Sequence, residues 1–114
     1  MIAITTHVLD LAHGRAAQGV PVVLEYKCPD GSWVLVGARD TDADGRVRDF
    51  YVDGHVLAEG VHRLTFALST YFAKVGERCF FPQACLEFEV FDATQHHHVP
   101  LLVSPYGYST YRGS

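Results

Sequence analysis

The sequence contains no hydrophobic run that approaches the roughly 20 residues needed to cross a bilayer, so we expect no membrane segment. The N-terminal segment lacks the basic stretch followed by an apolar one that marks a secretory signal. Three cysteines at spacings that fit no metal-ligand motif predict neither a disulfide framework nor a zinc site. Together these absences predict a cytoplasmic protein with reduced thiols.

Basic residues are also few, because 9 Lys and Arg stand against 13 Asp and Glu for a formal net charge of −4. No basic patch stands out, which argues against nucleic acid as a partner. The 114 residues include no linker, repeat or low-complexity stretch. A chain of this length can bury a core of its own. We therefore expect one globular domain over residues 1–114.

The pattern that is present is alternation with period two, which is typical of half-buried strands. In Leu86, Phe88 and Val90, apolar side chains alternate with two glutamates. Further candidate strands cover residues 2–10, 20–27, 33–38, 46–52, 63–68, 97–103 and 107–111, with turns that include Asp44-Gly45 and Asp53-Gly54. Residues 69–76 can form a short helix, with Ser69 or Thr70 as N-cap and Gly76 at its end. These elements predict an all-β fold, an antiparallel β-sandwich with one short helix.

Two segments contain residue types that bind metals, but the arrangement of these residues does not predict a metal site. In a strand, His96 and His98 point to one face and His97 to the other, so the three histidines cannot chelate one ion, although a two-histidine surface site stays open. Residues 40–45 match the first half of an EF-hand loop, but Tyr51 stands where the bidentate Glu is needed. We expect a tight turn there, and no metal or other cofactor.

Three segments carry a family resemblance: THVLD at residues 6–10, DGR at 44–46 and HVPLLVSPYGYSTYRGS at 98–114. The sequence resembles the 5-hydroxyisourate hydrolases, and the terminal YRGS is the hallmark of that family. The family is similar to transthyretin. The resemblance implies two four-stranded sheets per subunit and a short helix after the fifth strand. It also implies a homotetramer built as a dimer of dimers, with active sites at the dimer–dimer interface.

The same resemblance implies the site residues. The family's catalytic residues fall on His7, Arg46 and His98, and its substrate-binding residues on Arg46 and on the tail, Tyr111, Arg112, Gly113 and Ser114. The implied substrate is 5-hydroxyisourate, opened by water to 2-oxo-4-hydroxy-4-carboxy-5-ureidoimidazoline. Histidine suits the base and arginine the cation that such a reaction needs. The sequence departs from the family at His97, where a tyrosine is usual. By strand parity, this change should affect the face opposite His98.

Two rival functions are weighed against the hydrolase. One is a transthyretin-like carrier of a small apolar ligand, which the His7, Arg46 and His98 set and the polar tail argue against. The other is a structural module that binds a protein along an exposed strand edge. That alternative gives no reason for the terminal YRGS.

Overall fold

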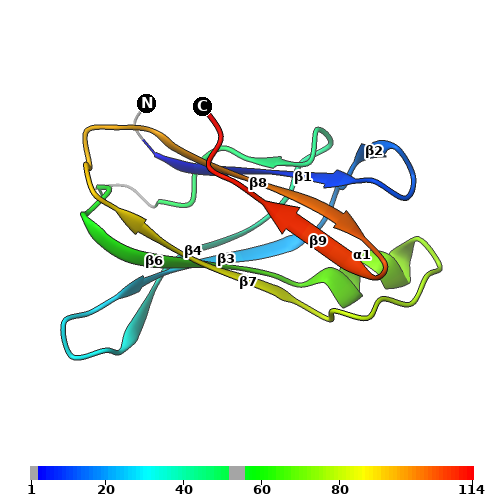
Figure 1. Ribbon diagram of the computed structural model, residues 1–114, viewed down its shortest axis with the longest axis horizontal. Helices are drawn as coiled ribbons and strands as arrows, with labels where there is room; N and C mark the ends of the chain where they lie inside the picture. The colour runs from blue at the N-terminus through cyan, green and yellow to red at the C-terminus, as the bar shows by residue number, and fades with distance from the viewer. Residues whose placement is uncertain (1–2, 52–55) are drawn as a thin grey trace.

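Two β-sheets pack face to face in the computed structural model, which describes residues 3–51 and 56–114 (Figure 1). One sheet has the strand order β2-β1-β8-β9, with β5 also paired to β1, and the other has the order β4-β3-β6-β7. The strands are β1 Ile4–Asp10, β2 Arg15–Ala16, β3 Pro21–Lys27, β4 Trp33–Asp40, β5 Arg46–Val47, β6 Gly60–Phe66, β7 Ala84–Val90, β8 His97–Ser104 and β9 Gly107–Thr110. The predicted all-β sandwich is confirmed, with five rather than four strands in the first sheet.

Alternating burial along the strands explains why the sheets stack. In β1, every second residue from Ile4 to Asp10 is buried, and the residues between them are half-exposed. The inward side chains of both sheets meet in one core, whose largest members include Phe50, Phe66 and Phe72, all with no exposed surface. The outward residues of β1 and β8 do not contribute to this core and can line a site on the surface of the sheet.

The strand pair β1 and β8 departs from the predicted antiparallel arrangement, because these two strands are parallel. Thr5 lies opposite His98 in the register, and Thr6 lies opposite Val99. A tight hairpin can join only antiparallel neighbours, whereas parallel neighbours need a long crossover connection. Here the crossover is most of the chain, so local sequence patterns gave no sign of this pairing.

The predicted strand at 46–52 was too long, since β5 ends at Val47. After β5, Asp49 Oδ1 accepts a hydrogen bond from the Tyr51 amide at 2.9 Å. A side chain that satisfies a nearby amide offers the backbone an alternative to the sheet ladder. Val52, the predicted Asp53-Gly54 turn and Ile2, the predicted start of the first strand, lie outside the described residues.

The helix α1, Leu68–Lys74, begins earlier than predicted. Its N-cap is Ala67, with no side-chain cap, so the prediction of Ser69 or Thr70 was wrong. Buried Leu68, predicted to extend the strand face, starts the helix instead. The predicted end is confirmed, because Gly76 has a φ of 77° and the Glu77 amide donates to the Phe72 carbonyl at 2.9 Å. No helix within residues 3–51 and 56–114 has the length and hydrophobicity to cross a membrane.

Candidate active site

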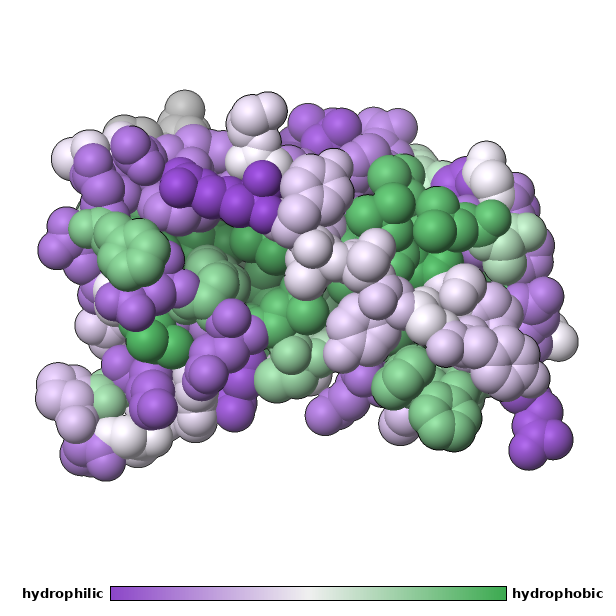
Figure 2. Space-filling model, in the orientation of Figure 1, coloured by the Kyte–Doolittle hydropathy of each residue, from purple (hydrophilic) through white to green (hydrophobic). Residues whose placement is uncertain are grey.

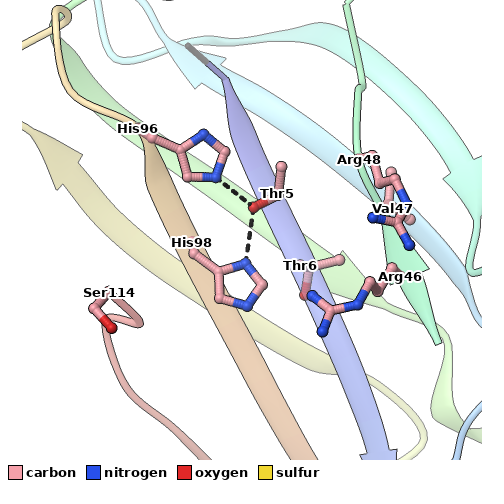
Figure 3. A pocket seen from close by; sticks show the side chains of 8 residues that line it. All are labelled: Thr5, Thr6, Arg46, Val47, Arg48, His96, His98 and Ser114. Carbon is pink, nitrogen blue, oxygen red and sulfur yellow. Dashed lines mark hydrogen bonds between the residues drawn. The ribbon is translucent and has the colours of Figure 1, made fainter. Parts of the chain in front are cut away.

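A polar cavity of about 470 Å³ opens on the outward face of the β1–β8 sheet (Figure 3). Its lining includes two histidines, two arginines and the hydroxyl residues Thr5 and Ser114, while the hydroxyl of Thr6 is buried and donates to the Val99 carbonyl. The lining residues are Thr5, Thr6, Arg46, Val47, Arg48, His96, His98 and Ser114. They come from β1, from β5 and the residue that follows it, from β8 and the residue before it, and from the end of the chain. Segments distant in sequence therefore build one site.

Strand β1 is the element that unites these segments, since it pairs with β5 on one edge and β8 on the other. Register places His7 opposite Arg46 and Thr5 opposite His98. Thr5 and His7 are two residues apart, so their side chains leave the same face of the strand. The cationic and imidazole groups therefore flank β1 from its two sides.

The terminal segment crosses close to His98. The Gly113 amide donates a hydrogen bond to the His98 carbonyl at 2.8 Å. A Cβ atom built on Gly113 would lie 2.6 Å from His98 Cδ2, a separation that real Cβ atoms do not tolerate. Only glycine lets the tail approach this closely and bring Ser114 to the cavity.

The surroundings of His98 favour its neutral imidazole over the protonated form. Partial burial lowers its pKa from the ordinary histidine value, the guanidinium of Arg46 lowers the pKa further, and the neighbouring His7 and His96 act in the same direction. Its Nδ1 atom lies 2.8 Å from the Thr5 hydroxyl oxygen. Nε2 is the nitrogen left to act in the cavity. A neutral histidine with one free nitrogen is the form that can accept a proton from water.

The sequence-predicted residues divide into two groups. Arg46, His98 and Ser114 line the cavity, and His7 adjoins it through its pairing with Arg46. The side chains of Tyr111 and Arg112 instead line a second cavity of about 320 Å³, which also contains His97.

Figure 2 shows the β7–β9 face of the molecule, with an apolar hollow bordered by polar side chains. Here lies the second cavity, whose apolar walls include Leu86, Phe88 and Val99. His97 points toward this side and is only 5% exposed, which confirms the prediction that it faces away from His98. Residue 97 thus lies on the inward face of β8, away from the polar cavity.

Sequence reasoning missed Thr5 and His96 as members of the site. The Thr5 hydroxyl oxygen lies 2.9 Å from His96 Nε2, as well as 2.8 Å from His98 Nδ1. Strand parity had already placed Thr5 on the face of His7, and His96 on the face of His98. The missing information was the β1–β8 register, which sets the two faces side by side.

The acidic segment at residues 40–45 forms a turn, as predicted. Asp42 Oδ1 accepts hydrogen bonds from the amides of Asp44 at 2.9 Å and Arg46 at 3.0 Å. These bonds, with a lesser contribution from Arg48 and Arg46 charge, lower the pKa of Asp42. The carboxylate thus helps to place the start of β5. Within the part of the chain that the structure describes, no group of three or more His, Cys, Asp or Glu side chains could hold a metal ion.

Fold and site together define a transthyretin-like β-sandwich with a histidine- and arginine-lined polar cavity. Comparison with known proteins agrees, since the sequence model described as the HIUase/Transthyretin family matches residues 4–113. A 5-hydroxyisourate hydrolase of Caulobacter vibrioides is 46% identical over 118 residues, with 100% of both chains covered. The chain therefore belongs to the HIUase/Transthyretin family.

Solved structures resemble both branches of this family. The 5-hydroxyisourate hydrolase of Klebsiella pneumoniae superimposes with a TM-score of 0.85 at 33% identity and covers 100% of both chains. Transthyretin from Sparus aurata superimposes with a TM-score of 0.91 at 25% identity, covering 99% of this chain and 97% of its own. Because the backbone fits both proteins well, the fold alone does not distinguish their functions, and the side chains of the cavity must do so.

Proposed function

We propose that this protein is a 5-hydroxyisourate hydrolase of urate breakdown, which opens 5-hydroxyisourate to 2-oxo-4-hydroxy-4-carboxy-5-ureidoimidazoline. The observation that carries the proposal is one cavity lined by an imidazole, His98, and by the cation Arg46, which lowers the pKa of that imidazole. Relatives that match nearly the whole chain at 41% and 46% identity bear the name of this hydrolase. The reaction requires water, a base, a cation and a proton for the leaving nitrogen.

The reaction begins when His98 Nε2 removes a proton from a water molecule. The water oxygen attacks a ring carbonyl carbon of the substrate, and the developing oxyanion is stabilised by the guanidinium of Arg46. The carbon–nitrogen bond then breaks as a proton reaches the leaving nitrogen. His7, which adjoins Arg46 in the register, assists this proton transfer. No side-chain nucleophile, metal or other cofactor takes part in this scheme.

The tail completes the site in this proposal. Ser114 lines the cavity and is placed to hydrogen-bond the polar substrate edge. Gly113 permits the close approach to His98, so its role is steric. Tyr111 and Arg112 would support the tail from the neighbouring cavity and reach substrate only through association with another subunit.

We further propose that the protein acts as a homotetramer, a dimer of dimers, in the cytoplasm, with no nucleic acid or membrane partner. The position of the cavity on the outward face of the β1–β8 sheet supports completion by a second subunit. Large apolar side chains on the surface also favour association. Those exposed include Leu11, Phe80, Phe91, Tyr106 and Tyr111.

The alternative is a carrier of a small apolar ligand, which the resemblance to Sparus aurata transthyretin keeps in view. The lining of the candidate cavity speaks against it, because charged and hydroxyl groups predominate there. An apolar ligand would leave these groups without hydrogen-bond partners, at a cost in binding free energy.

A coupled ultraviolet assay tests the proposal. Urate oxidase generates 5-hydroxyisourate in place, and the decay of its absorbance is followed with wild type and with His7→Ala, Arg46→Ala and His98→Ala. Exposed Arg39 on β4 provides the matched control, Arg39→Ala. We expect wild type and the control to accelerate decay and each site variant to lose most of that acceleration. Unchanged spontaneous decay with wild type would refute the hydrolase and direct attention to the carrier.

A further inference from the structure

The Thr5 hydroxyl connects two imidazoles that differ in exposure (Figure 3). Its oxygen lies 2.8 Å from Nδ1 of the half-buried His98 and 2.9 Å from Nε2 of the exposed His96. Both distances are within the range of strong hydrogen bonds. Parallel register explains the arrangement, since Thr5 is opposite His98, and His96 precedes it by two residues on the same face.

A hydroxyl has one proton, which restricts the states of this trio. If Thr5 donates to His96 Nε2, it can accept only from a protonated Nδ1 of His98, and His98 Nε2 then carries the lone pair. If Thr5 donates to His98 Nδ1, it accepts from a protonated Nε2 of His96, and His98 Nε2 carries the proton. The position of one hydroxyl hydrogen therefore links the tautomers of both histidines.

We propose that Thr5 is a positioning residue that couples His98 to His96 and relays a proton between them during hydrolysis. This inference rests on the proposed function, whose base is His98. As the water oxygen bonds to the ring carbonyl carbon, its proton passes to His98 Nε2. The Nδ1 proton of His98 moves to the Thr5 oxygen, and the original Thr5 proton moves to His96 Nε2. His98 ends neutral, in its other tautomer, and His96 ends as the cation.

The second half of the reaction reverses the relay. His98 Nε2 gives its proton to the leaving ring nitrogen as the carbon–nitrogen bond breaks. Thr5 returns a proton to His98 Nδ1, and His96 Nε2 returns a proton to Thr5. All three side chains regain their starting states, and the only net change is the addition of water to the substrate.

Charge gives a reason for the relay. A positive His98 would be partly buried beside the guanidinium of Arg46, which is unfavourable. His96 is exposed, so water solvates the positive charge there at lower cost. Moving the proton to His96 therefore separates the charge from Arg46 while leaving His98 protonated at the nitrogen that faces the substrate.

The neighbouring threonine shows how a structural hydroxyl is used in the same strand. Thr6 is buried and donates to the backbone carbonyl of Val99 at 2.6 Å. Thr5 has side-chain partners instead, and both are imidazoles, which have one nitrogen that can donate a proton and one that can accept it. The Thr6 hydroxyl therefore satisfies a backbone carbonyl of the sheet, whereas the Thr5 hydroxyl connects two titratable side chains.

Kinetics of the full chain test the relay. Thr5→Val removes the hydroxyl with little change of shape, and Thr65→Val on β6 controls for the same change in a strand of the other sheet. We expect Thr5→Val to lower kcat by about 10–100-fold, a part of the effect of general base catalysis, with KM nearly constant. Thr5→Ser should restore most of kcat. If Thr5→Val does not fold, Thr5→Ala replaces it.

A double-mutant cycle with His96→Gln tests the coupling. If the hydroxyl works through His96, Thr5→Val/His96→Gln should be no slower than Thr5→Val alone. Three outcomes would each overturn the relay. In the first, the decreases in kcat of the two single variants multiply in the double variant. In the others, Thr5→Val has wild-type kcat, or Thr5→Ser is as slow as Thr5→Val.

Nitrogen NMR of the imidazoles, without substrate, separates this inference from the proposed function. In wild type, titration of His96 should shift the His98 Nδ1 resonance, and Thr5→Val should abolish that response. Thr65→Val should leave it intact. Absence of the response in wild type overturns the relay whatever the activity. If the response is present but the protein does not open 5-hydroxyisourate, the coupling of the two histidines is supported and only the proposed hydrolase function is refuted.

Discussion

His97 and His98 are adjacent in β8 but belong to different parts of the molecule. His98 faces the polar cavity, with the Thr5 hydroxyl at its Nδ1 and the cation Arg46 nearby. His97 faces the interior, is 5% exposed, and its Nδ1 has no hydrogen-bond partner among the described residues. Burial is the main cause of a lowered pKa in both, followed by the charge of Arg46 for His98 and of Arg112 for His97.

This comparison teaches that the face of the strand, rather than the residue type, decides what a histidine does here. On the outward face, a neutral imidazole with a free nitrogen beside a cation can act as a base. On the inward face, a neutral imidazole fills space, and its protonation would place an unpaired charge in the core. Outward substitutions should therefore change activity and inward ones should change stability.

The largest effect is expected from His98→Gln. Loss of the base should lower kcat/KM by about 10²–10⁴-fold, with little change in the melting temperature. His97→Leu removes a buried polar group at similar volume and should leave kcat/KM within a few-fold of wild type. The coupled assay and thermal unfolding measure both quantities. A His97→Leu enzyme as inactive as His98→Gln would break the division between the two faces.

The second largest effect is expected from Arg46→Gln. This variant should lower kcat/KM by roughly 10²–10³-fold, because stabilisation of the oxyanion is lost. The remaining activity should also have a changed pH profile. Arg46 lowers the pKa of His98, so its removal raises that pKa, and the base form is lost at a higher pH as the solution is acidified. The acidic limb of kcat should shift upward. Arg39→Gln is the control, and an unshifted limb would contradict the proposed proximity.

Gly113→Ala should have a smaller effect on activity, through geometry alone. The new methyl group would meet His98 Cδ2 at 2.6 Å, so either the ring or the tail must move. Displacement of a reacting group by about 1 Å can cost around 10²-fold, and we expect a loss of kcat/KM up to that size. Gly107→Ala at the start of β9, where a Cβ would meet only Ser104 Oγ at 3.9 Å, controls for the general effect of adding a methyl at glycine. Equal kcat/KM values for the two variants would argue against the steric role.

The smallest effect should be an acid-dependent loss of stability from the inward histidines. His62 on β6 is 1% exposed, is stacked with Phe88 at 5.8 Å, and has its pKa lowered by burial despite a hydrogen bond to the Gly60 carbonyl. A histidine whose pKa is lowered in the folded state binds its proton more readily when unfolded. The stability is therefore present above the ordinary histidine pKa and declines as the pH falls below it.

Denaturant unfolding between pH 7 and pH 5 measures this decline. Each inward histidine can contribute at most about 1.4 kcal/mol per pH unit, and His62→Leu or His97→Leu should flatten the slope. The series is best made in the His98→Gln background, because the pKa of His98 is lowered too. An identical slope in all variants would assign the acid sensitivity to other groups.

Local sequence patterns predicted the parts of the fold that depend on neighbours in the chain. Alternation identified the strand containing Leu86, Phe88 and Val90, and Gly76 marked the end of the helix. The predicted length of the strand after Arg46 was wrong, since the pairing with β1 ends at Val47 and the Tyr51 amide bonds to the Asp49 side chain instead of a neighbouring strand. The parallel pairing of β1 and β8 was missed since it depends on contacts between distant segments.

The candidate site also divides into features that the sequence predicted and features that depend on contacts between distant segments. Family resemblance pointed to Arg46, His98 and Ser114, which the cavity brings together, while their catalytic roles stay predictions. The roles of Tyr111 and Arg112 also stay predictions, and within one chain these residues lie at the other cavity. Strand parity gave each side chain its face, but it cannot give the register between two strands.

The parallel pair also has a consequence for how the protein folds. The Thr5–His98 contact closes a loop between residues 93 positions apart, and the chain gains nothing from that pairing until the loop is closed. Topologies dominated by such distant pairings fold slowly. Until β8 arrives, one edge of β1 remains open to other chains. During refolding, enzymatic activity should therefore return with the last slow phase, after most of the strand signal has already recovered.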